Sequence, residues 1–564
     1  MPTTFKALSE RLEKVEATKK RLEIIEQVAD FLKTLNADEL ELSVNLMIAR
    51  AFPKHSQKTL NVNWSTIRHS LQSIASFDWS LFQTAMAATG DIGSATRTLL
   101  ENSKTKKQTQ LLAQPLTIGE VRRTFEAIAQ ANGVGTKERK ERLITTLLSQ
   151  ASPVETKYLV KVFTGEMRTG LHEGLMEQAI AKAFSMPLQA VQHASMVLGD
   201  IGEVAAILKT KGAEGLEKVG FEVFRPVQLM LAKTADNVQE ALMEQDGVSA
   251  LEYKYDGARV QIHVKSGKVC VFSRRLTNVT DSLPEVVEMV KRNISAQSAI
   301  VEGEVVSFDA AGYPIAFQHL MRRFKRTRDI TGAQEKIPLT LILFDILYLN
   351  GESLIKHTYL KRRQILAQIA GEIPLSQQIL TDNPIRAQEF LQEALKAGHE
   401  GLMAKKLESP YTPGRRGKRW LKIKQVLEPL DLVITAAEYG YGRRKGWLSD
   451  YYLAARDPET GGFLEIGKTF KGLTDAEIID LTKRLKDLAV NQEGHRVIVL
   501  PKIVVEVAYN EIQQSPKYSS QMALRFARIT RIRDDKSPLE VSTIGQVREI
   551  FEQQFSKKGK YKTD

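Results

Sequence analysis

The chain has 564 residues, with 80 Lys and Arg against 67 Asp and Glu, and one cysteine. At roughly 150 residues per domain, this length favours three or four domains that each bury a core. The net charge of +13 favours a polyanionic partner, with nucleic acid ahead of an anionic membrane. A single cysteine, Cys270, excludes an intramolecular disulfide and a multi-cysteine zinc site. Without a signal-peptide pattern or an apolar run of ~18 residues, we expect a soluble, intracellular protein.

The N-terminal part is predicted to be helical. Apolar residues from Phe5 to Leu35, Leu22 among them, recur near the period of an amphipathic helix. Residues 119–131 and 157–184 also read as helix or helix-turn-helix. A plain helical bundle and a helical module that grips a phosphate backbone both fit this pattern.

The pattern changes near residues 212–220. Val260, Ile262 and Val264 then alternate with polar residues, and Ser266-Gly267 predicts a hairpin turn. A second change, near residues 427–431, precedes strand-like runs at 431–437 and 497–507 around one helix-like segment at 474–488. Strands arranged around one helix suggest a small β-barrel.

One phosphate-binding pattern is rejected. Residues 462–469 match the P-loop letter for letter, but their variable positions alternate like a strand. A P-loop must open directly into a helix, whereas the next helix signal begins only at Thr474. We therefore expect a strand that follows a turn.

The strongest chemical signal is Lys254-Tyr-Asp256-Gly257-Ala-Arg259. A lone lysine is usually a solvated surface group, but four fixed residues within six positions are rare by chance. Lysine attacks phosphorus only when neutral, so its pKa of about 10.4 must be lowered, or its proton removed, by burial and nearby cations. Arg259, Arg274 and Lys422 are the candidates for that cationic surround.

At these residues the chain resembles the ATP-dependent DNA ligases of archaeal and eukaryotic replication, within the covalent nucleotidyltransferase superfamily. The later motifs of that family follow in order: Ser273-Arg274-Arg275, Glu302-Gly303-Glu304, Phe344-Asp345-Ile346-Leu347-Tyr348, Glu400-Gly401-Leu402-Met403-Ala404-Lys405, Arg416 to Lys424, and Arg525 to Lys536. The resemblance covers almost the whole chain.

The resemblance implies a role for each motif. Lys254 would form a covalent lysyl-AMP, Phe344 would stack on adenine, and Glu304 would hold the ribose. The family's lysine pair, here Lys422 and Lys424, would contact the α-phosphate, and the last motif would orient pyrophosphate. ATP and Mg²⁺ are the implied cofactors. The expected nucleotide-binding residues are Glu252, Lys254, Arg259, Arg274, Glu304, Phe344, Arg416 and Lys422, and the expected metal ligands are Glu304 and Glu400.

Each motif also has a purely structural interpretation. Glu304 could be a solvated carboxylate, and Phe344 could belong to the core. The basic run from Lys405 to Lys424 could be a solvated face, but strand alternation places Lys422 and Lys424 on one side. The same alternation is taken to place Trp420, Leu421 and Ile423 on the other side. For the basic cluster Arg322, Arg323, Lys325, Arg326 and Arg328, DNA contact and solvation are equally favoured.

The resemblance implies three domains: a helical DNA-binding domain (1–220), an adenylation domain of antiparallel sheets with helices (221–426) and an OB-fold domain (427–564). The expected substrate is nicked duplex DNA, sealed in replication, repair and recombination by a cytoplasmic, nucleoid-associated monomer. The last motif lies far along the chain from Lys254, which suggests that the barrel closes for lysine adenylation. Gln108-Thr109-Gln110-Leu111-Leu112 sits where related archaeal ligases carry a sliding-clamp peptide, though Leu111 and Leu112 replace the usual aromatic anchors.

Other functions remain open at this point. An RNA ligase or a capping guanylyltransferase shares the lysine chemistry, and a non-catalytic DNA-binding scaffold could keep the fold. An NAD-dependent ligase is disfavoured, because that family carries a four-cysteine zinc module. The preference among ATP, ADP and GTP stays undetermined.

Overall fold

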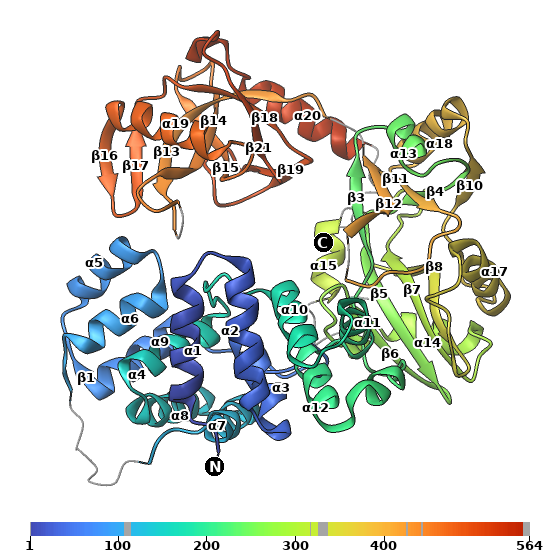
Figure 1. Cartoon of the computed structure of the whole chain (residues 1–564). Helices are drawn as coiled ribbons and strands as arrows, with labels where there is room; N and C mark the ends of the chain where they lie inside the picture. Colours follow the sequence, from blue (N-terminus) through green and yellow to red (C-terminus); the bar gives the residue numbers. More distant parts are fainter. Residues whose placement is uncertain are drawn as a thin grey trace. The chain divides into compact units, whose positions relative to one another are not determined.

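The computed structural model describes residues 2–105, 114–315, 317–324, 337–414, 416–424, 427–441 and 444–556. The chain divides into two compact units, Met1–Leu229 and Met230–Asp564 (Figure 1). The first unit is almost entirely helical, and the second carries the large sheets. This matches the expected order of a helical domain, a sheet-and-helix domain and a C-terminal sheet domain.

The first unit is a bundle of short helices around one apolar core. Its helices are α1 (Phe5–Ala17), α2 (Arg21–Thr34), α3 (Ala37–Met47), α4 (Trp64–Ile74), α5 (Trp79–Thr89), α6 (Ile92–Glu101), α7 (Ile118–Gln130), α8 (Thr136–Gln150), α9 (Pro153–Thr164), α10 (Glu173–Ala183), α11 (Leu188–Leu198) and α12 (Ile201–Glu217). A short strand pair joins β1 (Ala75–Ser76) to β2 (Lys104–Thr105).

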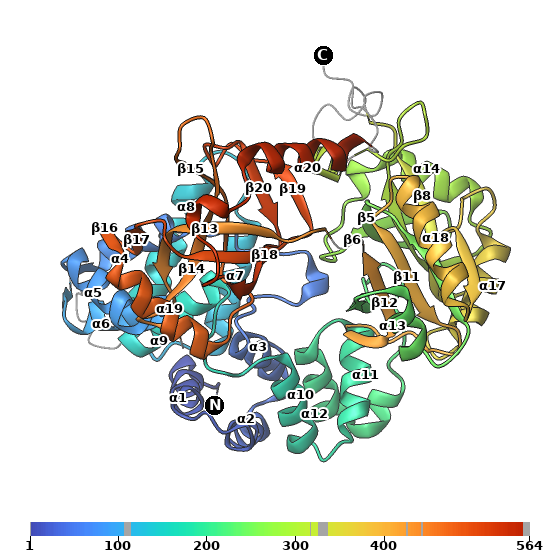
Figure 2. The same cartoon turned by 90° about the horizontal axis from the view of Figure 1, so that it is seen from above.

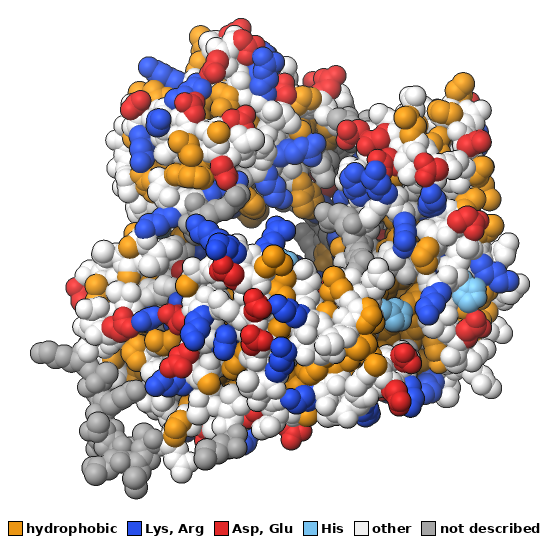
Figure 3. Space-filling view, in the orientation of Figure 1, with side chains coloured by type: hydrophobic (Ala, Val, Ile, Leu, Met, Phe, Trp, Pro, Cys, Tyr) orange, Lys and Arg blue, Asp and Glu red, His pale blue; other side chains and the backbone are white. Residues whose placement is uncertain are grey.

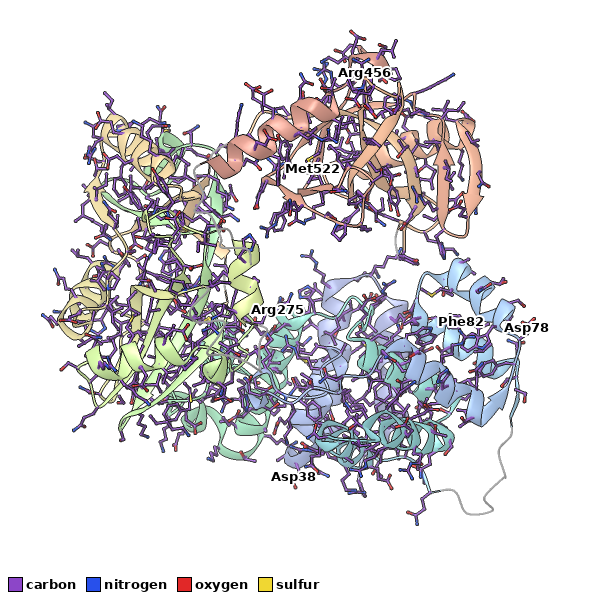
Figure 4. All side chains as sticks on the ribbon, turned by 180° about the vertical axis from the view of Figure 1, so that it is seen from behind. Asp38, Asp78, Phe82, Arg275, Arg456 and Met522 are labelled. Atoms are coloured by element: carbon purple, nitrogen blue, oxygen red, sulfur yellow. The ribbon has the colours of Figure 1, made fainter. Side chains whose placement is uncertain are left out.

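Local capping explains where several of these helices begin. The Thr117 and Ser152 hydroxyls accept backbone N–H groups in capping boxes at the starts of α7 and α9. Asp78 caps α5, the helix that also carries Phe82 (Figure 4). The N-terminal apolar pattern forms two helices instead of one, and Leu22 is 80% exposed, so its expected place on the buried stripe is wrong.

A buried ion network ties three helices of this unit together. Lys161 of α9 is fully buried, and its ammonium lies 3.1 Å from Glu16 of α1 and 3.0 Å from Asp91, the cap of α6. Lys157, one turn earlier, pairs with Glu13 at 2.5 Å. Each buried charge is compensated, which is the condition for burying charges at all.

On the face seen in Figure 3, Lys and Arg are interspersed with Asp and Glu over these helices.

The second unit begins with two five-stranded sheets. The first sheet has the order β10 (Gln378–Thr381), β4 (Ser249–Lys254), β11 (Gly401–Lys406), β12 (Arg416–Lys424) and β3 (Leu231–Ala235). The second has the order β6 (Lys268–Ser273), β5 (Ala258–Lys265), β7 (Ser298–Val306), β8 (Thr340–Leu349) and β9 (Glu352–Ser353). The strand pairs are antiparallel, except for the parallel pair β12–β3.

Helices cover one face of each sheet. Helices α13 (Val238–Glu244) and α18 (Pro384–Lys396) pack on the apolar face of β4, β11 and β12 (Figure 2). Helices α14 (Pro284–Asn293) and α17 (Tyr359–Ile369) pack on the second sheet. Because side chains alternate along a strand, the residues between these apolar positions point to the opposite faces. Those opposite faces carry the polar residues of the candidate site.

The hairpin β5–β6 forms as predicted. Ser266 and Gly267 have φ values of 49° and 76°, as a two-residue type I′ turn requires. Val260, Ile262 and Val264 point into the core under α14 and α17. The intervening His263 is fully buried on the other face, where its ring meets Phe272 edge-on and its Nε2 lies 3.0 Å from the Gln261 side-chain oxygen.

His263 makes the stability of this domain sensitive to acid. Burial lowers the pKa of His263 from 6.5 to about 3. Because the folded pKa lies below the unfolded one, stability is fully present above about pH 6.5 and is lost as the pH falls towards 3. Thermal melting of wild type and His263→Gln across this range should therefore diverge. We expect the wild type to lose up to about 1.4 kcal/mol more per pH unit. Parallel pH dependences of the two proteins would contradict this prediction.

The C-terminal part is a twisted sheet with one inserted helix. Its main path is β15 (Phe463–Thr469), β14 (Leu448–Arg456), β13 (Leu430–Tyr439), β17 (Arg496–Val499) and β16 (Ala489–Glu493). Strand β18 (Val504–Ala508) pairs with β13 and with β21 (Arg528–Ile532), and β19 (Glu511–Gln514) pairs with β20 (Met522–Arg525). Helix α19 (Asp475–Asp487) packs against β14, and α20 (Ile544–Ser556) packs against β19 and β14.

Two sequence predictions are decided here. Residues 463–469 form strand β15, and the next helix is α19, capped by Thr474, so rejecting the P-loop was correct. The strand-like run at 497–507 forms two strands, β17 and β18. Pro501 lies in the break, where a residue without a backbone N–H cannot continue a ladder.

Candidate active site

The register of the first sheet brings the lysine motifs together. Gly401 of β11 lies opposite both Lys254 of β4 and Lys424 of β12. Met403 is likewise paired with Glu252 and Lys422. Residues opposite one another in antiparallel strands share a face. Three separate sequence motifs therefore meet on the face opposite to α13 and α18.

One carboxylate joins the two motif lysines. The Lys254 Nζ lies 2.7 Å, and the Lys424 Nζ 2.6 Å, from the same oxygen of Glu400. Gly401, the next residue, has a φ of 140°, and a Cβ there would lie 2.2 Å from the Ile423 carbonyl oxygen. Glycine is therefore required for β11 to approach β12 this closely.

Lys254 is held in its charged form. Burial by itself lowers the pKa of Lys254, but the carboxylates of Glu400 and Glu304 outweigh burial and raise that pKa. In this state the pKa of Lys254 is thus raised and not lowered, so attack on phosphorus requires removal of its proton. The Arg259 guanidinium donates to Glu302, and Arg274 is exposed. The charges that act most strongly on Lys254 are therefore those of acidic residues.

The two predicted metal ligands have different electrostatic environments. Burial, together with the Glu400 and Asp256 carboxylates, raises the pKa of Glu304 to about 7, against the opposing effect of Lys254 and Arg259. Burial also raises the pKa of Glu400, but Lys254 and Lys424 outweigh it and lower that pKa. Glu304 is therefore poised between its two protonation states near neutral pH, whereas Glu400 is ionised.

Arg259 is locked where the two sheets meet. Its guanidinium donates to the Met230 carbonyl oxygen at 2.8 Å and to the Glu302 carboxylate at 2.9 Å. The Tyr411 hydroxyl lies 2.9 Å from both oxygens of Glu302 and accepts the Met230 N–H at 2.8 Å. Burial opposes the charge of Arg259, but Glu302 outweighs it and raises the pKa of Arg259. Glu302 and Tyr411 were not predicted as site residues, because their partners are distant in sequence.

A β-bulge sets the direction of Phe344. Glu302 pairs with Asp345 and Gly303 pairs with Leu343, so Phe344 is an extra residue in β8. A bulge re-aims a side chain relative to its neighbours. The partly buried Phe344 ring lies 5.4 Å from the Arg259 guanidinium and 6.2 Å, edge-on, from the Trp420 ring. Phe344 is thus neither ordinary core nor fully exposed.

Trp420 lies on the opposite face from the expected one. Leu421 and Ile423 enter the core under α18 as predicted, and Lys422 and Lys424 share the other face. Trp420 is two residues before Lys422, so alternation places it with the lysines, and its assignment to the apolar side is wrong. Trp420 is 1% exposed, its ring lies 5.4 Å from the Arg259 guanidinium, and it meets the Tyr411 ring edge-on.

Other predicted positions lie at the periphery or outside the described residues. Arg274 is exposed in the turn after β6, beside Arg275 (Figure 4). Lys422 is partly buried, while the side chain of Arg416, the first residue of β12, lies outside the description. Residues 108–112, the clamp-peptide candidate, also lie outside it.

The basic cluster at residues 322–328 contains one buried member. Arg323 of α15 (Phe317–Phe324) is 1% exposed and pairs with Glu285 of α14, so neither DNA contact nor solvation describes it. The Arg322 side chain and Lys325, Arg326 and Arg328 lie outside the described residues.

The site offers carboxylate oxygens for a metal, without a complete protein cage. Within the described ranges, no group of three or more His, Cys, Asp or Glu residues is arranged to hold an ion. Glu304, Glu400 and Asp256 nevertheless influence one another around Lys254. Mg²⁺ is commonly bound by one or two carboxylates plus substrate phosphates, and this donor set fits that mode. None of the helices described has the length and apolar character needed to cross a bilayer.

Comparison with known proteins agrees with this architecture. Three family descriptions match: "DNA ligase N terminus" at residues 4–181, "ATP dependent DNA ligase domain" at 229–424 and "ATP dependent DNA ligase C terminal region" at 444–536. DNA ligase 1 of Korarchaeum cryptofilum is 44% identical, covering 98% of this chain and 99% of its own. The DNA ligase of Thermococcus onnurineus is 42% identical, covering 99% of both chains.

A solved structure shares the fold. "Pmar-Lig_PreS3" aligns with 93% of this chain and 99% of its own, with a TM-score of 0.60 at 18% identity. The chain belongs to the family of ATP-dependent DNA ligases. It is an enzyme that uses ATP to seal nicks in DNA, which decides against an RNA ligase, a capping enzyme, an NAD-dependent ligase and a non-catalytic scaffold.

Proposed function

We propose that nick sealing proceeds through a lysyl-AMP on Lys254. The observation that carries this proposal is the pairing of two lysines with one carboxylate. The Lys254 Nζ lies 2.7 Å, and the Lys424 Nζ 2.6 Å, from the same oxygen of Glu400. Lys254 lies at the end of a strand whose apolar side chains are anchored in the core beneath α18. A nucleophile fixed in this way meets the α-phosphorus with little loss of orientational entropy.

In the first step the Lys254 nitrogen forms a bond to the α-phosphorus, and the bond to pyrophosphate breaks. Lys254 must first lose a proton, and the Glu400 carboxylate, 2.7 Å from the Lys254 Nζ, is placed to accept it. Lys422 and Lys424 share the face of Lys254 and supply positive charge to the phosphate oxygens. When bound, Mg²⁺ would be held by Glu304 and Glu400 and would neutralise charge on the triphosphate.

The nucleotide-binding group is proposed from the same geometry. Glu252, Arg259, Phe344 and Trp420 belong to one contact network, in which Lys405 contacts Glu252 and Trp420, and Arg259 lies over the Phe344 and Trp420 rings. Arg274, Arg416 and Lys422 complete the proposed set of cations. In the second step AMP passes to the 5′-phosphate at the nick. In the third step the neighbouring 3′-hydroxyl attacks that phosphate, seals the strand and releases AMP.

The wider cellular role is part of the proposal. We assign residues 1–220 to DNA binding, 221–426 to adenylation and 427–564 to an OB-fold. The net charge of +13 supports a nucleic-acid partner. The protein would act as a cytoplasmic, nucleoid-associated monomer in replication, repair and recombination. Gln108-Thr109-Gln110-Leu111-Leu112 would bind a sliding clamp, and a clamp pull-down unaffected by replacing Leu111 and Leu112 with Ala would remove that assignment.

The proposed function is tested with matched nicked substrates. A duplex with one labelled 5′-phosphate at a nick is offered as DNA and as RNA of the same sequence, with Mg²⁺ and ATP, ADP or GTP. We expect a ligated product from DNA with ATP, and an adenylated nick as the transient species. Sealing of RNA at an equal or higher rate, or repeated sealing without a nucleotide by enzyme stripped of bound AMP, would contradict the proposal. Omission of the divalent cation should stop the reaction.

A further inference from the structure

The Arg259 guanidinium has one donor that no protein group accepts. Its Nη1 donates to the Met230 carbonyl oxygen at 2.8 Å. Its Nη2 donates to the Glu302 carboxylate at 2.9 Å and to the Tyr411 hydroxyl at 3.4 Å. Within the described part of the chain, the buried Arg259 Nε has no hydrogen-bond partner. A buried donor that the protein leaves unpaired calls for an explanation, and an oxygen of a bound ligand supplies one.

Arg259 stands in the proposed nucleotide site. It lies opposite Glu304 in the pairing of β5 with β7, and Arg259 and Lys254 both oppose the raised pKa of that carboxyl group. The Phe344 and Trp420 rings each lie 5.4 Å from its guanidinium. A nucleotide beside Lys254 brings phosphate and ribose oxygens into this site, and a charged N–H donor forms strong hydrogen bonds to such oxygens.

The Tyr411 hydroxyl holds the guanidinium in its orientation. Tyr411 is 2% exposed, and its hydroxyl accepts the Met230 N–H at 2.8 Å and the Arg259 Nη2. The same hydroxyl donates to Glu302, whose two oxygens both lie at 2.9 Å. A tyrosine hydroxyl has one donor and two acceptor sites, so all of them are used here. Because a guanidinium is planar and rigid, fixing Nη1 and Nη2 also fixes the direction of Nε.

A fully buried ion pair places Tyr411 in turn. Arg362 of α17 donates to the two oxygens of Asp345 at 2.8 and 3.0 Å, and both side chains are 0% exposed. The Arg362 Nη1 donates to the Ser409 carbonyl oxygen at 3.1 Å, two residues before Tyr411. The Arg362 guanidinium also lies 5.7 Å from the centre of the Tyr411 ring. Tyr411 is thus held at its ring and at its hydroxyl, as a support for another side chain requires.

We propose that Tyr411 is a positioning residue that, together with Glu302, orients Arg259 so that the Arg259 Nε donates to an oxygen of the bound nucleotide. This inference rests on the proposed lysyl-AMP chemistry, which brings the nucleotide to Lys254. Tyr411 acts through Arg259 and not by contact with the substrate. Without the hydroxyl, Glu302 loses a donor and Arg259 loses an acceptor, so the guanidinium is free to turn and its Nε is no longer directed at the nucleotide.

The test measures ATP affinity in a double-mutant cycle. All proteins carry Lys254→Ala, so that ATP and Mg²⁺ bind without reaction, and the Kd for ATP is read by titration calorimetry. We expect Tyr411→Phe to weaken ATP binding about tenfold, because a charge-assisted hydrogen bond loses its geometry. In the presence of Arg259→Met, the same Tyr411→Phe change should weaken binding by less than about twofold, because the group through which Tyr411 acts is already gone. A purely structural role of Tyr411 would weaken binding equally in both backgrounds.

Tyr253→Phe is the matched control for the loss of a hydroxyl. Tyr253 is a buried tyrosine of β4, and its ring packs against Phe390 in the core beneath α18, on the other face of the sheet. This variant should bind ATP with unchanged affinity.

A second variant keeps the test decisive if Tyr411→Phe does not fold. Glu302→Gln removes the carboxylate that links the hydroxyl to Arg259, and its effect on ATP affinity should likewise depend on Arg259. Unchanged ATP affinity in whichever of the two variants folds, or an equal loss with and without Arg259, would overturn the inference. Failure of the wild type to form any lysyl-AMP would instead overturn the proposed function.

Discussion

Replacing Lys254 by alanine is expected to abolish covalent labelling of the chain by α-labelled ATP. The proposed bond forms at the Lys254 nitrogen, and the neighbouring Lys424 is paired with Glu400 at 2.6 Å. Freshly stripped wild type should carry label that survives a denaturing gel, and Lys254→Ala should carry less than about 1 part in 10³ of it. The ligation of ordinary nicks should fall equally.

The same variant should keep a measurable rate on nicks that already carry AMP, because the third step needs no lysine nucleophile. Lys265→Ala is the control, since Lys265 is an exposed lysine at the end of the adjacent hairpin strand. It should label like wild type. Label that persists in Lys254→Ala would place the nucleophile elsewhere and remove the mechanism proposed above.

Arg531→Ala is expected to separate the first step of the reaction from the last. Arg531 is exposed on β21 opposite Glu506, while Arg533 and Lys536 of the same motif are engaged by Asp431 at 3.2 and 2.5 Å. Of these three cations, Arg531 is thus the one most accessible to pyrophosphate. Loss of one cation that stabilises developing phosphate charge should slow adenylation by about 10²-fold.

Sealing of pre-adenylated nicks by Arg531→Ala should remain within about threefold of wild type, since pyrophosphate has already left. The two rates are measured separately, by single-turnover labelling with ATP and by joining of a synthetic adenylated nick. Lys483→Ala, an exposed cation on α19, controls for the removal of positive charge from this domain. An equal loss of both steps in Arg531→Ala would refute a role confined to adenylation.

Local pattern was sufficient to predict much of this molecule. Ser266-Gly267 predicted the β5–β6 turn because few residue pairs accept two positive φ values. Thr474 with Glu477 marked the start of α19 through a capping box. The alternation of Lys422 and Lys424 with apolar residues predicted their common face, because the period of a strand is two.

The features that local pattern missed depend on contacts between distant segments. The bulge at Phe344 is defined by the register of β8 against β7, which no property of residue 344 alone specifies. Trp420 was assigned by its apolar character, although the period of the strand places it beside the lysines. Arg323 was counted as a surface cation because its partner, Glu285, is 38 residues away.

The electrostatic environment of Lys254 was also beyond local pattern. The basic residues in the motifs suggested a cationic surround, whereas the fold brings Glu400 and Glu304 to the lysine. Glu400 precedes a glycine whose close approach to Ile423 is a property of the assembled sheet. The acidic surroundings of Lys254 therefore follow from the packing of β4, β11 and β12, and not from the residue composition of the motifs.

The shared Glu400 oxygen between Lys254 and Lys424 has a consequence for which anions the resting enzyme admits. Both ammonium groups already contact this one carboxylate, so an incoming phosphate must compete with Glu400 for them. When inorganic phosphate alone takes the lysines, Glu400 is left without a cationic partner, so little binding energy results. A nucleotide accompanied by a divalent cation supplies a partner for the displaced carboxylate as well as for the lysines. We therefore expect the resting enzyme to bind simple anions more weakly than a nucleotide that arrives with its divalent cation.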